Sequence, residues 1–204
     1  MIAGYRIHGH AIVSDDHRIA APDGTTPPEL MNPTDWRRFQ AALEVAAVIV
    51  LGRRGHEANP NVKGRNRLVL SASARGVERR AHAWWWNPAE APVEQAFAHA
   101  APAGGIAAVP GGRRVFDLFL GISFDEFHLT RAAGVIVPGG IPLFSAADDG
   151  LTPEAILAGR GLIAGPRKTL DPQCGVTLVI WRRGSASLDR STHPSDSRRP
   201  LPER

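Results

Sequence analysis

Cysteine is almost absent from this sequence, and long hydrophobic runs are absent altogether. Its one cysteine, Cys174, has no partner for a disulfide within the chain, so a reducing cytoplasm is the default compartment. No stretch approaches the roughly 18 to 20 consecutive apolar residues of a membrane span. The opening segment MIAGYRIHGHAIVSDD lacks the basic region and apolar stretch of a secretory signal. We therefore expect a cytoplasmic protein that does not associate with membranes.

The charge balance is mildly basic, without a motif for nucleic-acid binding. The 204 residues carry 24 Lys and Arg against 20 Asp and Glu, a net charge of +4 spread along the chain. This balance suits a small anionic ligand better than a nucleic-acid backbone. The length favours one domain, residues 1–183, as a monomer or a homodimer. An Arg-, Ser- and Pro-rich tail, residues 184–204, has little to bury and is expected to be disordered.

The segment 48–72 organises the predicted fold. Residues 48–51 and 67–70 are short apolar runs typical of buried parallel strands. Between them we expect a glycine turn, Gly52–Arg53–Arg54, followed by a polar connection. This turn places positive charge at the carboxyl end of a strand, where open α/β sheets bind anions. Paired arginines suit a phosphorylated ligand, although a solvated turn explains them about equally well.

A second glycine corner follows the predicted strand 105–109. Gly111 and Gly112 separate this strand from a helix that begins at Arg113. A strand, paired glycines and a helix N-terminus let backbone N–H groups approach a phosphate. Two anion-binding corners together suggest a dinucleotide. The segment does not match G-x-G-x-x-G, so a Rossmann fold is not indicated.

The first helix is expected over residues 32–47. Asn32 or Thr34 can cap it, and Asp35 lies where the helix dipole favours a negative charge. Asp35 also borders the apolar stripe of the helix, so it is either a surface carboxylate or an acid at the mouth of a cleft, able to bind an amidine-like ring edge. The stripe is formed by Trp36, Phe39, Leu43 and Ala47.

Two further features precede this helix. Residues 14–33 form a long connection without apolar periodicity, which suggests a functional lid. Before it, Tyr5–Val13 is expected to be the central strand, with His8 and His10 on one face. No neighbouring Cys or carboxylate cluster completes a metal site around these histidines, so none is expected.

The remaining elements complete an α/β pattern. In the strand expected at 82–86, alternation places Trp84 and Trp86 on one face and Trp85 on the other. Helices are expected at 92–100 and 151–158, and a mixed-polarity strand at 124–130. Segments 162–170 and 176–181 suggest a closing antiparallel hairpin at the sheet edge.

Six motifs in this order resemble the dihydrofolate reductase family, including the reductase domains of riboflavin biosynthesis, over residues 9–182. The motifs are HAIVSDDHRIA, NPTDWRRF, VIVLGRRGHE, KGRNRLVLSAS, AVPGGRRVFDLFL and DEFHLTR. The resemblance implies a three-layer α/β fold with a mostly parallel, twisted, eight-stranded sheet. It also implies an antiparallel C-terminal strand and helices on both faces.

The resemblance also implies roles for individual residues. Asp35 is the active-site carboxylate, supported by Thr130. His10, Phe39 and Arg65 face the substrate, with Arg65 binding the glutamate tail of folate. NADPH is the implied cofactor and a dihydropterin or folate the implied substrate. The implied cofactor-binding residues are Ala11, Ile19, Gly52, Arg53, Arg54, Leu70, Ser71, Gly111, Gly112, Arg113, Arg114 and Val115.

The sequence departs from the family pattern at three places. Leu30 or Met31 stands near the usual loop tryptophan, Gly55 and His56 follow the Gly-Arg corner where a threonine is usual, and His10 replaces an apolar residue. Three functions therefore stay open. The first is dihydrofolate reduction by NADPH, the second is reduction of a ribosylated pyrimidine or another small substrate, and the third is non-catalytic nucleotide binding.

Overall fold

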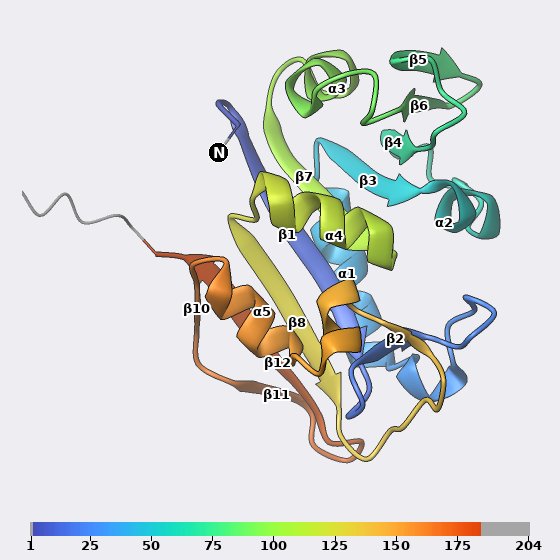
Figure 1. Cartoon of the computed structure of the whole chain (residues 1–204). Coiled ribbons are helices and arrows are strands. Elements are labelled where there is room, and N and C mark those ends of the chain that lie inside the picture. The colour runs from blue at the N-terminus through green and yellow to red at the C-terminus, as the bar shows by residue number, and fades with distance from the viewer. Residues whose placement is uncertain (1, 185–204) are drawn as a thin grey trace, which may run out of the picture.

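The computed structural model describes residues 2–184, which form a ten-stranded sheet with helices on both faces (Figure 1). The strand order is β10-β12-β8-β1-β7-β3-β4-β6-β5, and β11 also pairs with β12. The small strands β2 (Arg18–Ala20) and β9 (Ile141–Pro142) form a separate pair. The strands of the main sheet are β1 (Tyr5–Val13), β3 (Val48–Gly52), β4 (Arg67–Leu70), β5 (Val77–Arg80), β6 (Ala83–Trp86), β7 (Gly105–Gly111), β8 (Glu126–Ala132), β10 (Leu162–Ala164), β11 (Lys168–Asp171) and β12 (Val176–Arg183).

Helices cover the sheet as two layers, because both faces carry apolar side chains. The helices are α1 (Pro33–Glu44), α2 (Arg53–Ala58), α3 (Val93–Ala100), α4 (Arg113–Ile122) and α5 (Pro153–Gly159), with 3-10 turns η1 (Pro28–Leu30) and η2 (Ser145–Asp149). Leu43 of α1 joins a small core cluster with Ile49 and Val69 of the sheet. Phe97 of α3, Phe119 of α4 and Leu157 of α5 join the larger cluster. In Figure 1, α4 and α5 lie in front of the sheet and α1 lies behind it.

The central strands are parallel, so their carboxyl ends share one edge of the sheet. β1 pairs in parallel with β7 on one side and β8 on the other, and β3 pairs in parallel with β7. β12 runs antiparallel to β8. The expectation of a mostly parallel sheet with an antiparallel C-terminal strand is therefore confirmed.

Several local predictions are confirmed as well. β1 and β4 have the expected bounds, and Asn32 caps α1. Trp84 and Trp86 pack with the larger cluster, whereas Trp85 packs with the smaller one on the opposite face.

Other predictions were wrong. Arg53 begins the short helix α2 rather than lying in a turn, and β5 was missed because its residues are mostly charged. Trp36 was expected in the apolar stripe of α1, but it is 57% exposed. The connection 14–33 contains β2 and η1. The sheet has ten strands rather than eight, because β5 extends one edge while β10 and β11 pair with successive parts of β12 at the other. The tail prediction concerns residues 184–204, of which 185–204 lie outside the described residues.

Gly9 of β1 tests the packing of the larger core. A Cβ atom there would lie 2.3 Å from the ring of Phe127, which is fully buried. Gly9→Ala should therefore lower the free energy of unfolding by about 1–3 kcal/mol, the usual cost of overpacking. Urea unfolding followed by circular dichroism measures this change.

Gly121→Ala is the matched control. Gly121 lies in α4, and a Cβ atom there would meet nothing within 4 Å. Since alanine favours a helix over glycine, this variant should be unchanged or up to about 1 kcal/mol more stable. Equal destabilisation by both substitutions would contradict the packing of β1 against Phe127.

Candidate active site

A partly buried acid joins the first helix to the sheet at its carboxyl edge. The Asn32 side chain accepts hydrogen bonds from the N–H groups of Thr34 and Asp35, both at 3.0 Å, and so fixes the first turn of α1. Asn32 also donates to Asp171 of β11 at 2.9 Å, which anchors the start of this helix. The Asp35 side chain is 13% exposed and accepts a hydrogen bond of 2.6 Å from the hydroxyl of Thr130 in β8. The predicted contact between Asp35 and Thr130 is therefore present.

The environment of Asp35 favours the protonated acid. Burial raises the pKa of the Asp35 carboxyl, while the Thr130 hydrogen bond and the positive charge of Arg38 oppose this shift. The Nε atom of Arg38 lies 3.8 Å from Asp35 Oδ1, so the two groups attract without a close hydrogen bond. Such a carboxyl can hold or give up a proton near an apolar surface.

Glu126 and His128 lie on the same face of β8 as Thr130, and these three residues are called the polar column below. Its members alternate along the strand as Glu126, His128 and Thr130, so they share one face. The guanidinium of Arg38 lies 2.9 Å from His128 Nδ1, and His128 Nε2 lies 3.1 Å from Glu126. Glu126 also accepts a hydrogen bond of 3.2 Å from Arg182 of β12. The column thus leads from the partly buried Asp35 toward the more exposed ion pair of Glu126 and Arg182.

Two histidines of β1 line the same face. His10 stands opposite His128 in the register, with ring centroids 4.5 Å apart, and His8 stands opposite Glu126. Burial, together with the neighbouring His128 and Arg38, lowers the pKa of His10 to about 2. Burial together with Arg38 lowers the pKa of His128 to about 4. Both rings are therefore neutral at physiological pH.

The two glycine corners lie side by side at the carboxyl edge. Leu51 at the end of β3 is in register with Gly111 at the end of β7. A Cβ atom on Gly52 would lie 3.5 Å from Val115 of α4, so the two corners are in contact. Both corners therefore lie at the same edge of the sheet.

The second corner is shaped by its glycines. The Gly111–Gly112 peptide is cis, and Gly111 has a φ of +112° that favours glycine. A Cβ atom on Gly111 would lie 2.7 Å from Phe116, whereas one on Gly112 would meet nothing within 4 Å. Gly112 is also the N-cap of α4. The N–H group of Val115 donates to the Gly112 carbonyl at 2.9 Å, whereas the N–H groups of Arg113 and Arg114 come too early in the helix to have a partner within it. An anion can therefore approach the backbone at Gly112.

Arginines surround both corners. Arg53 and Arg54 are exposed in the first turn of α2, and Arg53 lies 3.6 Å from Glu57, one turn along. Arg114 is exposed in the first turn of α4, and Arg113 donates to Asp148 of η2 at 3.2 Å. Three of the four guanidiniums are exposed and able to meet a ligand from solvent.

The strand order sets the distance between the acid and the corners. Thr130 is on β8, β1 comes next, and the Gly111–Gly112 corner follows at the end of β7. Adjacent strands are about 4.8 Å apart, so β8 and β7 are roughly 10 Å apart. One extended ligand can therefore contact both the corners and the region of Asp35.

The other implied site residues are placed as follows. Ala11 of β1, Ile19 of β2 and Leu70 of β4 are partly buried against the larger core cluster. The hydroxyl of Ser71, just after β4, is 2.9 Å from that of Ser73. Phe39 stacks obliquely between His10 and Trp36, with ring centroids 6.0 and 5.7 Å away.

Arg65 was expected to bind a substrate carboxylate, but its guanidinium is engaged within the protein. It donates to Gln40 at 2.9 Å and to Glu44, both on α1, and its side chain is 14% exposed. Near the place of the usual loop tryptophan, Leu30 is buried and Met31 is 62% exposed.

Sequence reasoning missed Arg38, Glu126 and His128 as parts of this site. The signal for Glu126 and His128 was present, since both alternate with Thr130 along the expected strand. The signal for Arg38 was also present, since it follows Asp35 by three residues and so lies on the same side of α1.

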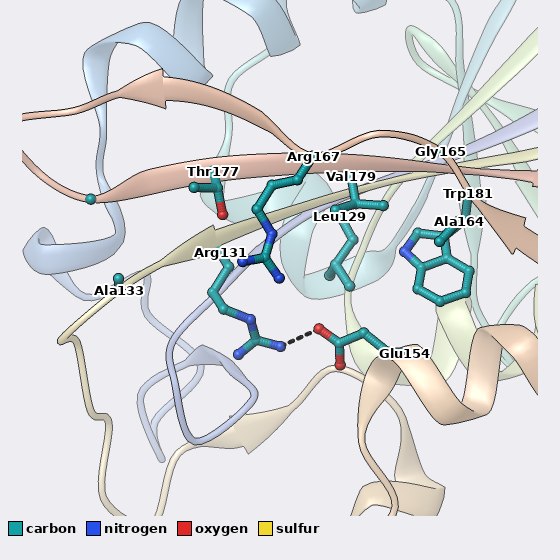
Figure 2. Close-up of a pocket in the computed structure, with 11 residues that line it drawn as sticks. Leu129, Arg131, Ala133, Glu154, Ala164, Gly165, Arg167, Thr177, Val179 and Trp181 are labelled. Atoms are coloured by element: carbon teal, nitrogen blue, oxygen red, sulfur yellow. Dashed lines mark hydrogen bonds and ion pairs between the residues drawn. The ribbon is translucent and has the colours of Figure 1, made fainter.

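A separate cavity of about 370 Å³ lies on the opposite face of the sheet (Figure 2). Its wall includes Leu129 of β8, which alternates with the residues of the polar column, and Val179 of β12, which is opposite Leu129 in the register. Arg131 donates to Glu154 of α5 within this cavity, so much of its charge is neutralised internally. The cavity is distinct from the region around Asp35.

Among residues 2–184, no helix combines the length and apolar character that crossing a bilayer requires.

Comparison with known proteins defines the fold. No family model matches the chain, and no curated protein matches it. Among solved structures, dihydrofolate reductase from Enterococcus faecalis complexed with NADP(H) is similar at a TM-score of 0.62 and 15% identity, covering 90% of this chain and 99% of that one. A pyrimidine reductase-like protein from Corynebacterium diphtheriae is similar at 0.62 and 19% identity, covering 87% and 91%.

A third similar structure is larger. The deaminase/reductase from Thermotoga maritima, a diaminohydroxyphosphoribosylaminopyrimidine deaminase and 5-amino-6-(5-phosphoribosylamino)uracil reductase, has a TM-score of 0.61 and 14% identity. The match covers 88% of this chain but only 57% of that one. Together with the sheet order and the paired-glycine corner, these similarities identify the chain as a protein of the dihydrofolate reductase-like fold.

Proposed function

We propose that this protein is an NADPH-dependent reductase of a small heterocyclic compound that presents an amino-imine ring edge to Asp35. One observation carries this proposal. A partly buried carboxylate, hydrogen-bonded to Thr130 at 2.6 Å, lies at the same sheet edge as two contiguous glycine corners bearing arginines. The reductases found among proteins of the same fold support it.

The edge of the sheet suits NADPH in charge and shape. The open surface over Gly112 and the first turn of α4 would take the pyrophosphate, since backbone N–H groups and the helix dipole favour an anion there. Arg53 and Arg54 would pair with the 2′-phosphate through charge-assisted hydrogen bonds. The complex of the Enterococcus faecalis enzyme with NADP(H) supports this choice of cofactor.

Asp35 would orient the substrate and control its proton. When bound, NADPH supplies the hydride for a C=N carbon. The carboxylate accepts two hydrogen bonds from the amino and ring N–H groups, which favours the protonated ring. Thr130 fixes the carboxylate by donating to one oxygen. Residues 14–33, with β2 and η1, would cover the reacting rings and exclude water.

Two substrate classes fit this chemistry. Dihydrofolate, reduced to tetrahydrofolate in folate and one-carbon metabolism, has the required aminopyrimidine edge. A ribosylated pyrimidine of the riboflavin-pathway type is favoured by one observation, namely that Arg65 is already bound to Glu44 and Gln40. A folate glutamate tail would have to displace these partners. A nucleotide-binding module without catalysis would bind NADPH and reduce neither compound.

The experiment that tests the proposal follows NADPH oxidation at 340 nm with dihydrofolate and with the ribosylaminopyrimidine substrate in parallel. Turnover of either compound supports the reductase, and the preferred compound identifies the substrate class. NADPH binding by fluorescence without turnover of any heterocycle would contradict the proposal and leave the nucleotide-binding module.

Asp35→Asn should lower kcat by about 100-fold or more while leaving the Kd for NADPH within about twofold. The reason is that the asparagine keeps the size of the side chain but cannot accept from both donors of the substrate or favour its protonation. Steady-state kinetics and fluorescence titration measure the two effects. Equal losses of turnover and NADPH affinity would argue against the assigned role.

The same variant tests the burial of the acid through the pH dependence of stability. Because the folded pKa of Asp35 is raised, its protonation favours folding. This contribution is complete below the unfolded pKa of about 3.9 and is lost as the pH rises through the folded value. Asp35→Asn should therefore gain stability relative to the parent protein between pH 3 and pH 7, as urea unfolding would measure. A relative loss over this range would mean that the folded pKa is lowered.

Arg53→Ala should weaken NADPH binding by roughly 10- to 100-fold and change NADH binding by less than about twofold. The expected loss corresponds to about 1.5–3 kcal/mol for hydrogen bonds to a charged group. Arg160→Ala is the matched control. Arg160 is also an exposed arginine, but it follows α5 and lies beside β10, the outermost strand of the sheet, far from the glycine corners. An unchanged ratio of NADPH to NADH affinity in Arg53→Ala would remove the phosphate assignment.

A further inference from the structure

Three histidines meet on the face of the sheet beneath α1. His8 and His10 alternate along β1, and the parallel register sets His10 directly opposite His128 of β8. A ligand nitrogen from each ring lies within 4.8 Å of the other two. The sequence shows only the first pair, since His128 comes from a distant strand, and for this reason no metal site was expected.

Two of these rings have an unused buried nitrogen. His8 Nε2 and His10 Nδ1 are buried and have no hydrogen-bond partner among the described residues. His10 as a whole is only 5% exposed. A buried polar atom without a partner costs stability, and a bound metal ion is one way to satisfy it.

The neighbouring side chains suit a ligand set of this kind. A histidine ligand usually uses its second nitrogen to contact a carboxylate, which fixes the ring. Glu126 lies 3.1 Å from His128 Nε2, which leaves His128 Nδ1 as the atom that can turn to a metal. Arg38 and Phe39 of α1 lie against His128 and His10, so this helix covers part of the site.

We propose that His8, His10 and His128 bind one divalent transition-metal ion of the zinc type. Three imidazoles with a fourth position for water is a common zinc arrangement, and imidazole suits this group of metals. Zinc–nitrogen bonds of about 2.0–2.1 Å place tetrahedral ligand atoms about 3.4 Å apart. The three rings therefore have to converge by about 1.5 Å, which side-chain rotation can supply.

Arg38 occupies the position where the ion would bind to His128, so replacing Arg38 tests the proposed site. Its guanidinium contacts His128 Nδ1 at 2.9 Å, so it has to leave before a cation binds there. Asp35, 3.8 Å from Arg38 Nε, is available to receive it. Because the guanidinium both blocks one ligand and repels the ion, its removal should strengthen metal binding.

Metal binding is measured on the full chain after chelator treatment, by calorimetric titration with Zn²⁺ and by the visible absorption of bound Co²⁺. We expect one ion per chain with a Kd in the micromolar range or tighter, and a Co²⁺ spectrum typical of tetrahedral coordination. Neither readout depends on turnover, so a failure here leaves the proposed reductase untouched, and a failed reductase assay leaves this site untouched.

Variants assign the site. His8→Ala and His10→Phe should each weaken Zn²⁺ binding by at least 100-fold, whereas Arg38→Met should strengthen it by about tenfold. His82→Ala is the matched control and should bind as the parent does, because His82 is an exposed residue just before β6. Circular dichroism verifies that each variant is folded.

Three outcomes would overturn the proposal. They are the absence of Zn²⁺ binding in both the parent and Arg38→Met, binding that survives both His8→Ala and His10→Phe, and binding that His82→Ala abolishes. The gain in affinity expected for Arg38→Met does not depend on the folding of the histidine variants.

Discussion

The hydrogen bond between Thr130 and Asp35 is the interaction on which the site depends. It joins the N-terminal turn of α1 to β8 and fixes a carboxylate that burial would otherwise make costly. Asn32 supports it from below by capping the helix and contacting Asp171. The acid is thereby held on rigid elements at the carboxyl edge of a parallel sheet, where a ligand bound by the neighbouring strands can reach it.

One face of the sheet carries the larger hydrophobic core, and the other carries the side chains of the candidate site. Under α4 and α5, buried aromatic rings such as Phe116, Phe119 and Phe127 form the larger core and supply most of the apolar burial. Under α1, β3 and β4 contribute Ile49 and Val69 to the smaller core cluster, whereas β1 and β8 present imidazoles and carboxylates, which contribute little to apolar burial. The protein can tolerate this polar face because the opposite face is densely packed.

The sequence predicted the parts of the fold that depend on local pattern and missed those that depend on register. β1, β4 and the capped start of α1 follow from periodicity and capping residues, and the second glycine corner follows from strand–glycine–helix order. The first corner was predicted as a turn, so its helix α2 was missed. The strand β5 was missed because its residues are mostly charged, and the expected burial of Trp36 was wrong. In both cases the position in the tertiary structure outweighed the residue type. The assembly of His10 with His128 could not be read from the sequence, since it depends on the pairing of strands 118 residues apart, here β1 with β8.

A crystal structure of the protein with NADPH tests the central claim most directly. We predict the pyrophosphate over Gly112, the 2′-phosphate beside Arg53, and the nicotinamide at the ends of β1 and β8 next to Asp35. Cofactor density in the cavity between Arg131 and Trp181, on the opposite face of the sheet, would contradict this arrangement. So would a nicotinamide directed away from Asp35.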